Sequence, residues 1–301
     1  MYIFPLISTA VSLVFAVMLG RQYAAKRKPY QLAWAGAMVM YGVASLAEAI
    51  GQMNGWNDPL VKTYYIFGAV MVVGYLALGT LYIQDPKVVR WIILIGGLLA
   101  VPAVFFSSFF SDTAGDVEKL VAIGLFEVVL IELMVLAWVA KDKFASIWLG
   151  HLVVGTVAGV VLTVLAKVNA TELAELAALN EVPYDAIAKS LFLRNTVISI
   201  NTIGGLVLIL GAVYSGYTLL RKNIMRETAI GTTLIGVGAV FPYSAGYLEG
   251  YFGAADQAIK SIFLTIGIVI MFIGFLQTGR RSTPPPAEPK AEAKTEVETP
   301  A

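Results

Sequence analysis

The sequence predicts an all-α integral membrane protein: a bundle of about nine transmembrane helices, with its N-terminus outside and its C-terminus in the cytoplasm. Hydrophobic residues make up 58% of the 301 residues and charged residues only 14%, whereas a soluble domain has about 25% charged residues. The chain also repeats apolar runs of nearly the length, about 20 residues, that a helix needs to cross a bilayer. We therefore expect a multi-pass protein of the cell (plasma) membrane, with a bundle over residues 1–281 and the lipid bilayer as its first partner.

Composition excludes several classes of function. A formal net charge of +1 gives no electrostatic footprint for nucleic acid. The absence of cysteine excludes disulfides, thiol nucleophiles and cysteine-ligated metals, and the single histidine makes a site with several histidine ligands improbable. The sequence therefore predicts no cofactor and no metal.

The first predicted span covers residues 3–20, and the basic residues Arg21, Lys26, Arg27 and Lys28 follow it. A secretory signal has the opposite order, because its positive charges precede its apolar run. We therefore expect a retained first helix that enters the membrane from outside.

The next four spans are predicted at residues 30–50, 60–83, 88–110 and 119–140. They form two pairs, and the returning helix of each pair begins near an aspartate, Asp58 or Asp116, which is a natural N-cap. The pair at 227–279 shares this plan. Internal repeats in one orientation are common in transporters, although capped membrane hairpins also resemble one another without being repeats.

A sixth span at residues 144–166 follows the charged turn at residues 141–143. The segment 167–191 after it alternates charged and apolar positions and contains Pro183, which favours an external amphipathic connector. This connector is either a lid over the bundle or a link that lies in the lipid headgroups, and the second interpretation is the simpler one.

The last three spans are predicted at residues 192–220, 227–248 and 257–279. The spacing Asp256-x-x-x-Lys260 also occurs on the retinal-binding helix of microbial rhodopsins. Lys260 is expected at the outer edge of its span, so we interpret this pair as helix capping. The tail, residues 282–301, is rich in Pro, Ala, Glu and Lys and is predicted to be disordered in the cytoplasm.

The orientation follows from the basic residues in alternate connections. They concentrate at residues 21–28, 87–90, 141–143 and 221–226, and again directly after the last span. Cytoplasmic connections carry an excess of Lys and Arg. These connections are therefore predicted to be cytoplasmic, and the tail with them.

Polar residues gather in the outer halves of the spans, whereas the inner halves are largely aliphatic. The candidate ligand-binding residues are Glu127, Glu48, Arg194, Asn201, Tyr243, Glu249 and Tyr64. We expect a polar cavity that opens outward, with Arg194 as the counter-ion of Glu48 or Glu127. The alternative is an interfacial belt of polar and aromatic residues, which membrane proteins commonly have.

A second candidate is the pair Glu132 and His151. Pairing the fifth and sixth spans about their short turn places Glu132 opposite His151 and Gly124 opposite Gly159. Glycines let helix backbones approach closely. The pair is either proton-sensitive or a structural contact between the two helices.

Two functions remain open. The first is binding or transport of a small solute or ion in an outward cavity, with proton linkage through Glu132 and His151 as an option. The alternative is a non-catalytic membrane subunit or sensory module that acts with a membrane protein partner. An enzyme is the weakest reading, since the chain has no cysteine, no second histidine and no GxSxG nucleophile turn.

Overall fold

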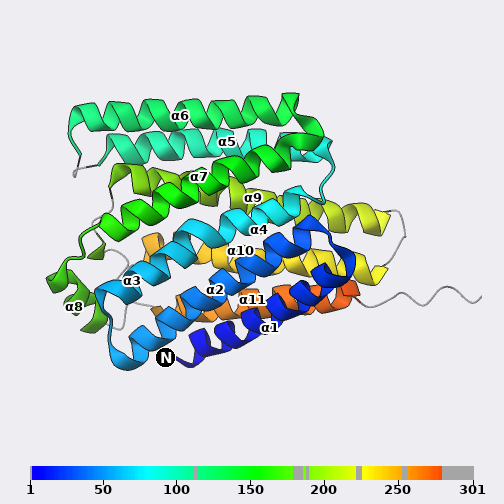
Figure 1. The fold of residues 1–301 in the computed structure, drawn as a ribbon, viewed down its shortest axis with the longest axis horizontal. Helices are drawn as coiled ribbons and strands as arrows, with labels where there is room; N and C mark the ends of the chain where they lie inside the picture. The colour runs from blue at the N-terminus through cyan, green and yellow to red at the C-terminus, as the bar shows by residue number, and fades with distance from the viewer. Residues whose placement is uncertain are drawn as a thin grey trace, which may run out of the picture.

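The computed structural model of the protein is a bundle of long helices (Figure 1). It describes residues 2–111, 114–178, 186–187, 190–221, 226–252 and 257–279. Of residues 177, 226, 245–252, 257–259 and 279 it describes the helical backbone only. The predicted disorder of the tail and the predicted role of the Glu249 side chain therefore lie outside the described residues.

The long helices are α1 (Ile3–Lys26), α2 (Pro29–Asn54), α5 (Pro86–Phe109), α6 (Asp116–Val139), α7 (Phe144–Leu165), α9 (Leu191–Arg221), α10 (Arg226–Phe252) and α11 (Gln257–Gly279). One further rod consists of α3 (Asp58–Tyr64), the π-helix η1 (Tyr65–Met71) and α4 (Val72–Leu81). The short elements are the 3-10 turn η2 (Lys141–Lys143) and α8 (Ala170–Ala178). Each of the nine predicted spans coincides with one of the helices or with the α3–α4 rod.

Within the described part of the chain, eight helices are long and apolar enough to cross a membrane. The eighth predicted span, residues 227–248, lies in α10, and α10 is the one long helix that is not among these eight. The eight are counted over residues whose side chains the structure describes, and these exclude residues 226 and 245–252 of α10.

The helix starts follow local chemistry, although not always through the predicted residue. The rod starts at Asp58, but its cap is Asn57, whose side chain accepts a hydrogen bond from the backbone N–H of Leu60. Asp58 instead forms an ion pair with Lys62 at 3.1 Å. Helix α6 starts at Asp116 without a side-chain cap. Both predicted starts are thus confirmed, and the predicted capping role of the two aspartates is wrong.

Two apolar cores share two helices. One core joins α4 and α9 to α5, α6 and α7, and the other joins α4 and α9 to α1, α2, α10 and α11. Figure 1 shows the same division, with α5, α6 and α7 along one side of the bundle and α1, α2 and α11 along the other. Helices α4 and α9 therefore hold the two halves together.

Glycine pairs bring α10 and α11 into backbone contact. A Cβ atom added at Gly231 would lie 2.5 Å from the carbonyl oxygen of Gly274, and one added at Gly238 would lie 2.7 Å from that of Gly267. The reverse additions, at Gly274 and Gly267, would meet the carbonyl oxygens of Gly231 and Gly238 at 2.5 and 2.8 Å. Since backbone atoms are met in every case, no side chain can move aside to make room.

The glycine register predicted for α6 and α7 is wrong. Nothing lies within 4 Å of a Cβ atom added at Gly124. A Cβ atom at Gly155 would meet Ile200 of α9 at 3.2 Å, and one at Gly159 would meet Val70 of η1 at 2.6 Å. Helix α7 therefore turns its glycines toward α9 and the rod, where larger side chains need the space.

We predict that Gly238→Ala lowers the thermal unfolding midpoint, because the added methyl group must push α10 and α11 apart. The expected loss is about 1–3 kcal/mol, as for other overpacked helix contacts. Gly124→Ala is the control, since its methyl group enters open space and alanine favours a helix over glycine by about 0.5–1 kcal/mol. Intrinsic fluorescence on heating measures both. Equal midpoints for the two variants would mean that the glycine contact is not tight.

Candidate functional site

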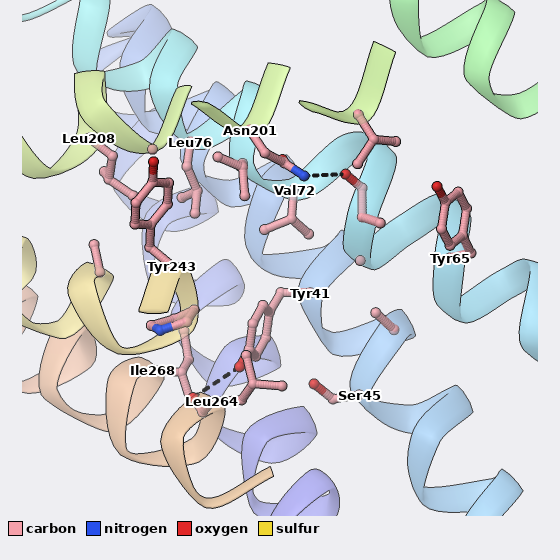
Figure 2. A pocket seen from close by; sticks show the side chains of 18 of the residues that line it. Tyr41, Ser45, Tyr65, Val72, Leu76, Asn201, Leu208, Tyr243, Leu264 and Ile268 are labelled. Atoms are coloured by element: carbon pink, nitrogen blue, oxygen red, sulfur yellow. Dashed lines mark hydrogen bonds between the residues drawn. The ribbon is translucent and has the colours of Figure 1, made fainter. Parts of the chain in front are cut away.

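A cavity of about 670 Å³ lies between α2, the α3–η1–α4 rod, α9, α10 and α11 (Figure 2). Five of the seven residues predicted to bind a ligand line it. These are Glu48, Tyr64, Arg194, Asn201 and Tyr243. The polar residues that the sequence places in the outer halves of separate spans are thus brought together in one place.

The cavity is polar at one end and apolar at the other. Glu48, Tyr64, Arg194 and Lys260 lie within two turns of those helix ends that meet at the α3 end of the bundle. Most of the lining residues farther along the same helices are apolar. They include Met38, Leu76, Leu208, Ile268 and Met271. Figure 2 shows Tyr41 and Tyr243 beside the space between the two ends. The arrangement fits a molecule with a polar head and an apolar body.

Glu48 is the acidic residue among the described residues of the lining, and its side chain joins α2 to α11. Only 2% of its surface is exposed. Its Oε1 accepts hydrogen bonds from Ser261 Oγ at 2.5 Å and from Gln52 Nε2 at 3.1 Å. A buried carboxylate needs such donors to offset its lost hydration. The two bonds therefore fix the carboxylate in the wall of the cavity.

Arg194 is held by the backbone of α5 and not by an acid. Its Nη2 donates to the carbonyl oxygen of Ser107, and its buried Nε has no hydrogen-bond partner among the described residues. Its guanidinium makes no ion pair with any described carboxylate. The predicted pairing of Arg194 with Glu48 or Glu127 is therefore wrong.

The residue after Arg194 explains why this part of α9 is fixed. Asn195 is fully buried, and its Nδ2 donates to Ser108 Oγ at 2.7 Å. Its Oδ1 accepts from Ser107 Oγ at 3.2 Å. These two bonds clamp the start of α9 to α5, so that the neighbouring Arg194 is presented to the cavity from a rigid position.

A π-helix forms another wall of the site. Asn201 Nδ2 donates to the carbonyl oxygen of Ala69, within η1, at 3.1 Å (Figure 2). Gly68 and Ala69 line the cavity on the same element. Single π-helical turns are frequent at functional sites because they leave backbone groups for side chains or ligands to satisfy. Across the cavity, Tyr41 donates from its hydroxyl to the carbonyl oxygen of Leu264 on α11 at 3.0 Å.

Several lining residues escaped the sequence-based selection. They are Tyr41, Ser45, Tyr65, Thr202 and Lys260. Helical spacing would have found two of them, because Tyr41 and Ser45 lie on the same stripe of α2 as Glu48. Lys260, interpreted from the sequence as part of a helix cap with Asp256, also lines the charged end of the cavity. Asp256 lies outside the described residues.

Glu127 does not belong to this cavity. It lies half-buried on α6, which forms an edge of the bundle (Figure 1), and α6 contributes no residue to the lining. Its depth in the membrane was predicted from the sequence, but the direction it faces depends on how α6 packs. The prediction that Glu127 is a principal ligand contact is wrong for this cavity.

The predicted contact between Glu132 and His151 is confirmed, with 3.7 Å between Oε2 and Nε2. His151 Nδ1 lies 3.0 Å from the carbonyl oxygen of Ile147. Since a carbonyl only accepts, Nδ1 carries a hydrogen and Nε2 is the remaining basic position. Nε2 is thus the ring nitrogen that faces the carboxylate of Glu132.

Helix α9 separates this pair from the cavity. His151 lines a second space of about 990 Å³ between α6, α7 and α9, whose walls are almost entirely apolar. Ser199 and Ile200 face that space, whereas Ile198 and Asn201 face the cavity. The pair of Glu132 and His151 and the candidate ligand site therefore lie on opposite sides of one helix.

Comparison with known proteins assigns no family. No family model, no curated protein and no solved structure matches this chain. Among the described residues, no three His, Asp or Glu side chains gather where they could hold a metal ion. The cavity itself is consequently the basis for a functional assignment.

We predict that Glu48→Met destabilises the protein by about 1–3 kcal/mol, because it leaves the buried donor of Ser261 and the partly buried donor of Gln52 without this acceptor. Glu127→Met is the matched control, because it replaces a half-buried carboxylate that has no described hydrogen bond. Thermal unfolding in detergent compares the two. If both variants unfold at the temperature of the native protein, Glu48 does not hold α2 to α11.

Proposed function

We propose that this protein is a multi-pass protein of the cell membrane that binds or transports a small amphipathic solute in the cavity between α2, α4, α9, α10 and α11. Nine crossings are supported by the eight long apolar helices and by α10, which lies within the same bundle. The ten connections and ends then alternate between the two sides of the membrane.

The charged end of the cavity faces outward in this proposal. The basic connections at residues 21–28, 87–90 and 141–143 lie at the opposite end of the helices from Glu48 and Arg194. Because Lys and Arg favour the cytoplasmic side, the N-terminus and the α3 end are assigned to the outside. A solute would then enter with the external solution or from the outer leaflet.

The observation that carries the proposal is the division of the lining into a charged end and an apolar end. Ligand sites are mostly apolar, with a few polar groups that fix orientation. A bare ion would make no contact with the apolar residues Leu208, Ile268 and Met271. A purely apolar molecule would offer Arg194 no polar group to bind. A solute with one polar head and one apolar body satisfies both ends.

A second candidate function is that of a membrane subunit or sensory module with a protein partner. The position of Glu132 favours it, since 52% of this side chain is exposed beside the apolar space between α6, α7 and α9. Exposed carboxylates within apolar helices are costly in lipid. A partner helix with a hydrogen-bond donor, seated against α6 and α7, would shield Glu132.

We predict that Gly68→Phe abolishes solute binding. A Cβ atom at Gly68 would meet only Ala44, at an ordinary 3.5 Å, so that the larger side chain can occupy the cavity without displacing the backbone. Gly124→Phe is the control, because it adds the same ring to open space on α6. The measurement is mass spectrometry of small molecules that copurify in mild detergent.

A solute should be present with the native protein and with Gly124→Phe, and absent from Gly68→Phe. Equal amounts in all three proteins would contradict the cavity as the binding site. Absence of a small molecule from all three, together with a protein partner at equal stoichiometry that is lost in Glu132→Gln, would favour the second candidate function.

A further inference from the structure

We infer that the protein has a second ligand site on the other side of α9. The apolar space between α6, α7 and α9 binds an uncharged, lipid-soluble molecule that carries one hydroxyl group, and this hydroxyl binds at His151. The site is separate from the solute cavity, because Ser199 and Ile200 face the second space whereas Ile198 and Asn201 face the cavity. The inference therefore goes beyond the proposed function and does not depend on it.

The second space is a wedge that closes toward the η2 turn. Its volume of about 990 Å³ lies at the upper end of the range for ligand pockets, about 300–1,000 Å³. Its lining stops at Leu133 on α6 and at Ile147 on α7. Beyond them, Ala137 and Phe144 are buried in one apolar core between the helices. Figure 1 shows α6 and α7 diverging from η2, so the space widens toward their other ends.

This closed end favours a molecule that lies within the membrane over a helix that crosses it. The longest wall, residues 147–162 of α7, measures about 22 Å at about 1.5 Å per residue. The hydrocarbon core of a bilayer is about 30 Å thick. A crossing helix could not follow the floor of the wedge past Ala137 and Phe144. A lipid-soluble molecule of limited length can fill the wedge from the bilayer.

The composition of the walls favours an uncharged ligand. No Lys, Arg, Asp or Glu belongs to the described lining, which includes Leu130, Leu152 and Val154. An ionised group among such walls would lose its hydration without a compensating partner. Glu132 lies beside the space and is not part of its lining. A neutral molecule with a large apolar body therefore fits these walls best.

His151 is the polar group that a ligand in this space can reach. Among the other polar groups of the described lining, Trp148 Nε1 and Thr196 Oγ1 already donate to backbone carbonyl oxygens, at 3.4 and 2.8 Å. Ser199 Oγ is buried and offers a ligand no surface. By contrast, 30% of the His151 side chain is exposed. The imidazole ring is therefore the group that orients the ligand.

The free side of the His151 ring selects a hydroxyl group. Nδ1 donates to the carbonyl oxygen of Ile147 at 3.0 Å, so Nε2 is the nitrogen that faces a ligand. Glu132 Oε2 lies 3.7 Å from Nε2, which exceeds the length of a hydrogen bond, about 2.7–3.2 Å. Nε2 of a neutral ring accepts a hydrogen bond, and a ligand hydroxyl donates one. Aliphatic and phenolic hydroxyls share this chemistry.

The experiment compares five single-tailed probes: dodecanol, octylphenol, dodecyl methyl ether, dodecanoate and dodecylamine. Each is titrated calorimetrically into the full-length protein in one non-ionic detergent. We expect the preferred alcohol to bind about five-fold more tightly than the ether, which lacks the donor, as one hydrogen bond provides. The two charged probes should bind more weakly than the ether. The ratio of dodecanol to octylphenol distinguishes an aliphatic from a phenolic hydroxyl.

Variants locate the hydroxyl and the body. His151→Phe should lower the affinity for the preferred alcohol about five-fold and leave that for the ether unchanged, because it keeps a ring and removes Nε2. Gly150→Phe should abolish binding of both, since Gly150 lines the space and a Cβ atom there meets nothing within 4 Å. Gly124→Phe is the matched control, because its ring also enters open space but outside the lining. Gly68→Phe, which fills the solute cavity, should leave both affinities unchanged.

Equal affinity of the alcohols and the ether, or a preference for either charged probe, would overturn the inference. A preference for the hydroxyl that persists in His151→Phe would also overturn it. If Gly68→Phe abolishes probe binding and Gly150→Phe does not, the alcohol occupies the solute cavity, which overturns the inference and supports the proposed function. If Gly68→Phe instead retains every copurifying solute while Gly150→Phe abolishes probe binding, the proposed function fails and this inference stands.

Discussion

Backbone contact between α10 and α11 is the constraint on which the cavity depends. The pairs Gly231 with Gly274 and Gly238 with Gly267 set the distance between the two helices, and any side chain at these positions would widen it. Helix α11 also supplies Ser261 to Glu48 and the carbonyl oxygen of Leu264 to Tyr41. Since Tyr243 approaches from α10, a shift between these helices would alter both ends of the site.

Helix α9 has a comparable role, because it forms a wall of two different spaces. It is fixed by hydrogen bonds at Asn195 and Asn201, toward α5 and η1. Farther along, Gly204 allows close packing, since a Cβ atom there would lie 3.2 Å from the backbone oxygen of Val73. Side-chain hydrogen bonds thus hold the first part of α9, and close packing against α4 holds the part that follows. The cavity and the apolar space beyond α9 remain separate as a result.

The sequence predicts depth in the membrane better than direction around a helix. Apolar length and flanking charges located the nine long helical elements, and a shared position along the helices selected Glu48, Arg194 and Asn201, which line one cavity. Glu127 has a similar depth, but α6 packs at the edge of the bundle and does not turn it toward the cavity. Helix rotation depends on contacts between residues far apart in the chain, such as Gly238 with Gly267, which hydropathy does not reveal. Glu132 and His151 were predictable because a short turn joins their helices.

Arg194 and the pair of Glu132 and His151 differ in how their polar groups are satisfied. His151 lies 3.7 Å from Glu132, and its Nδ1 lies 3.0 Å from the carbonyl oxygen of Ile147, so the chain itself supplies both contacts. Arg194 has a neutral carbonyl oxygen beside it and no ion pair with a described carboxylate. An arginine within a membrane span costs about 2.5–3.5 kcal/mol on insertion scales. In the proposed topology, such a group needs access to water or to a ligand, and the cavity that Arg194 lines offers this access.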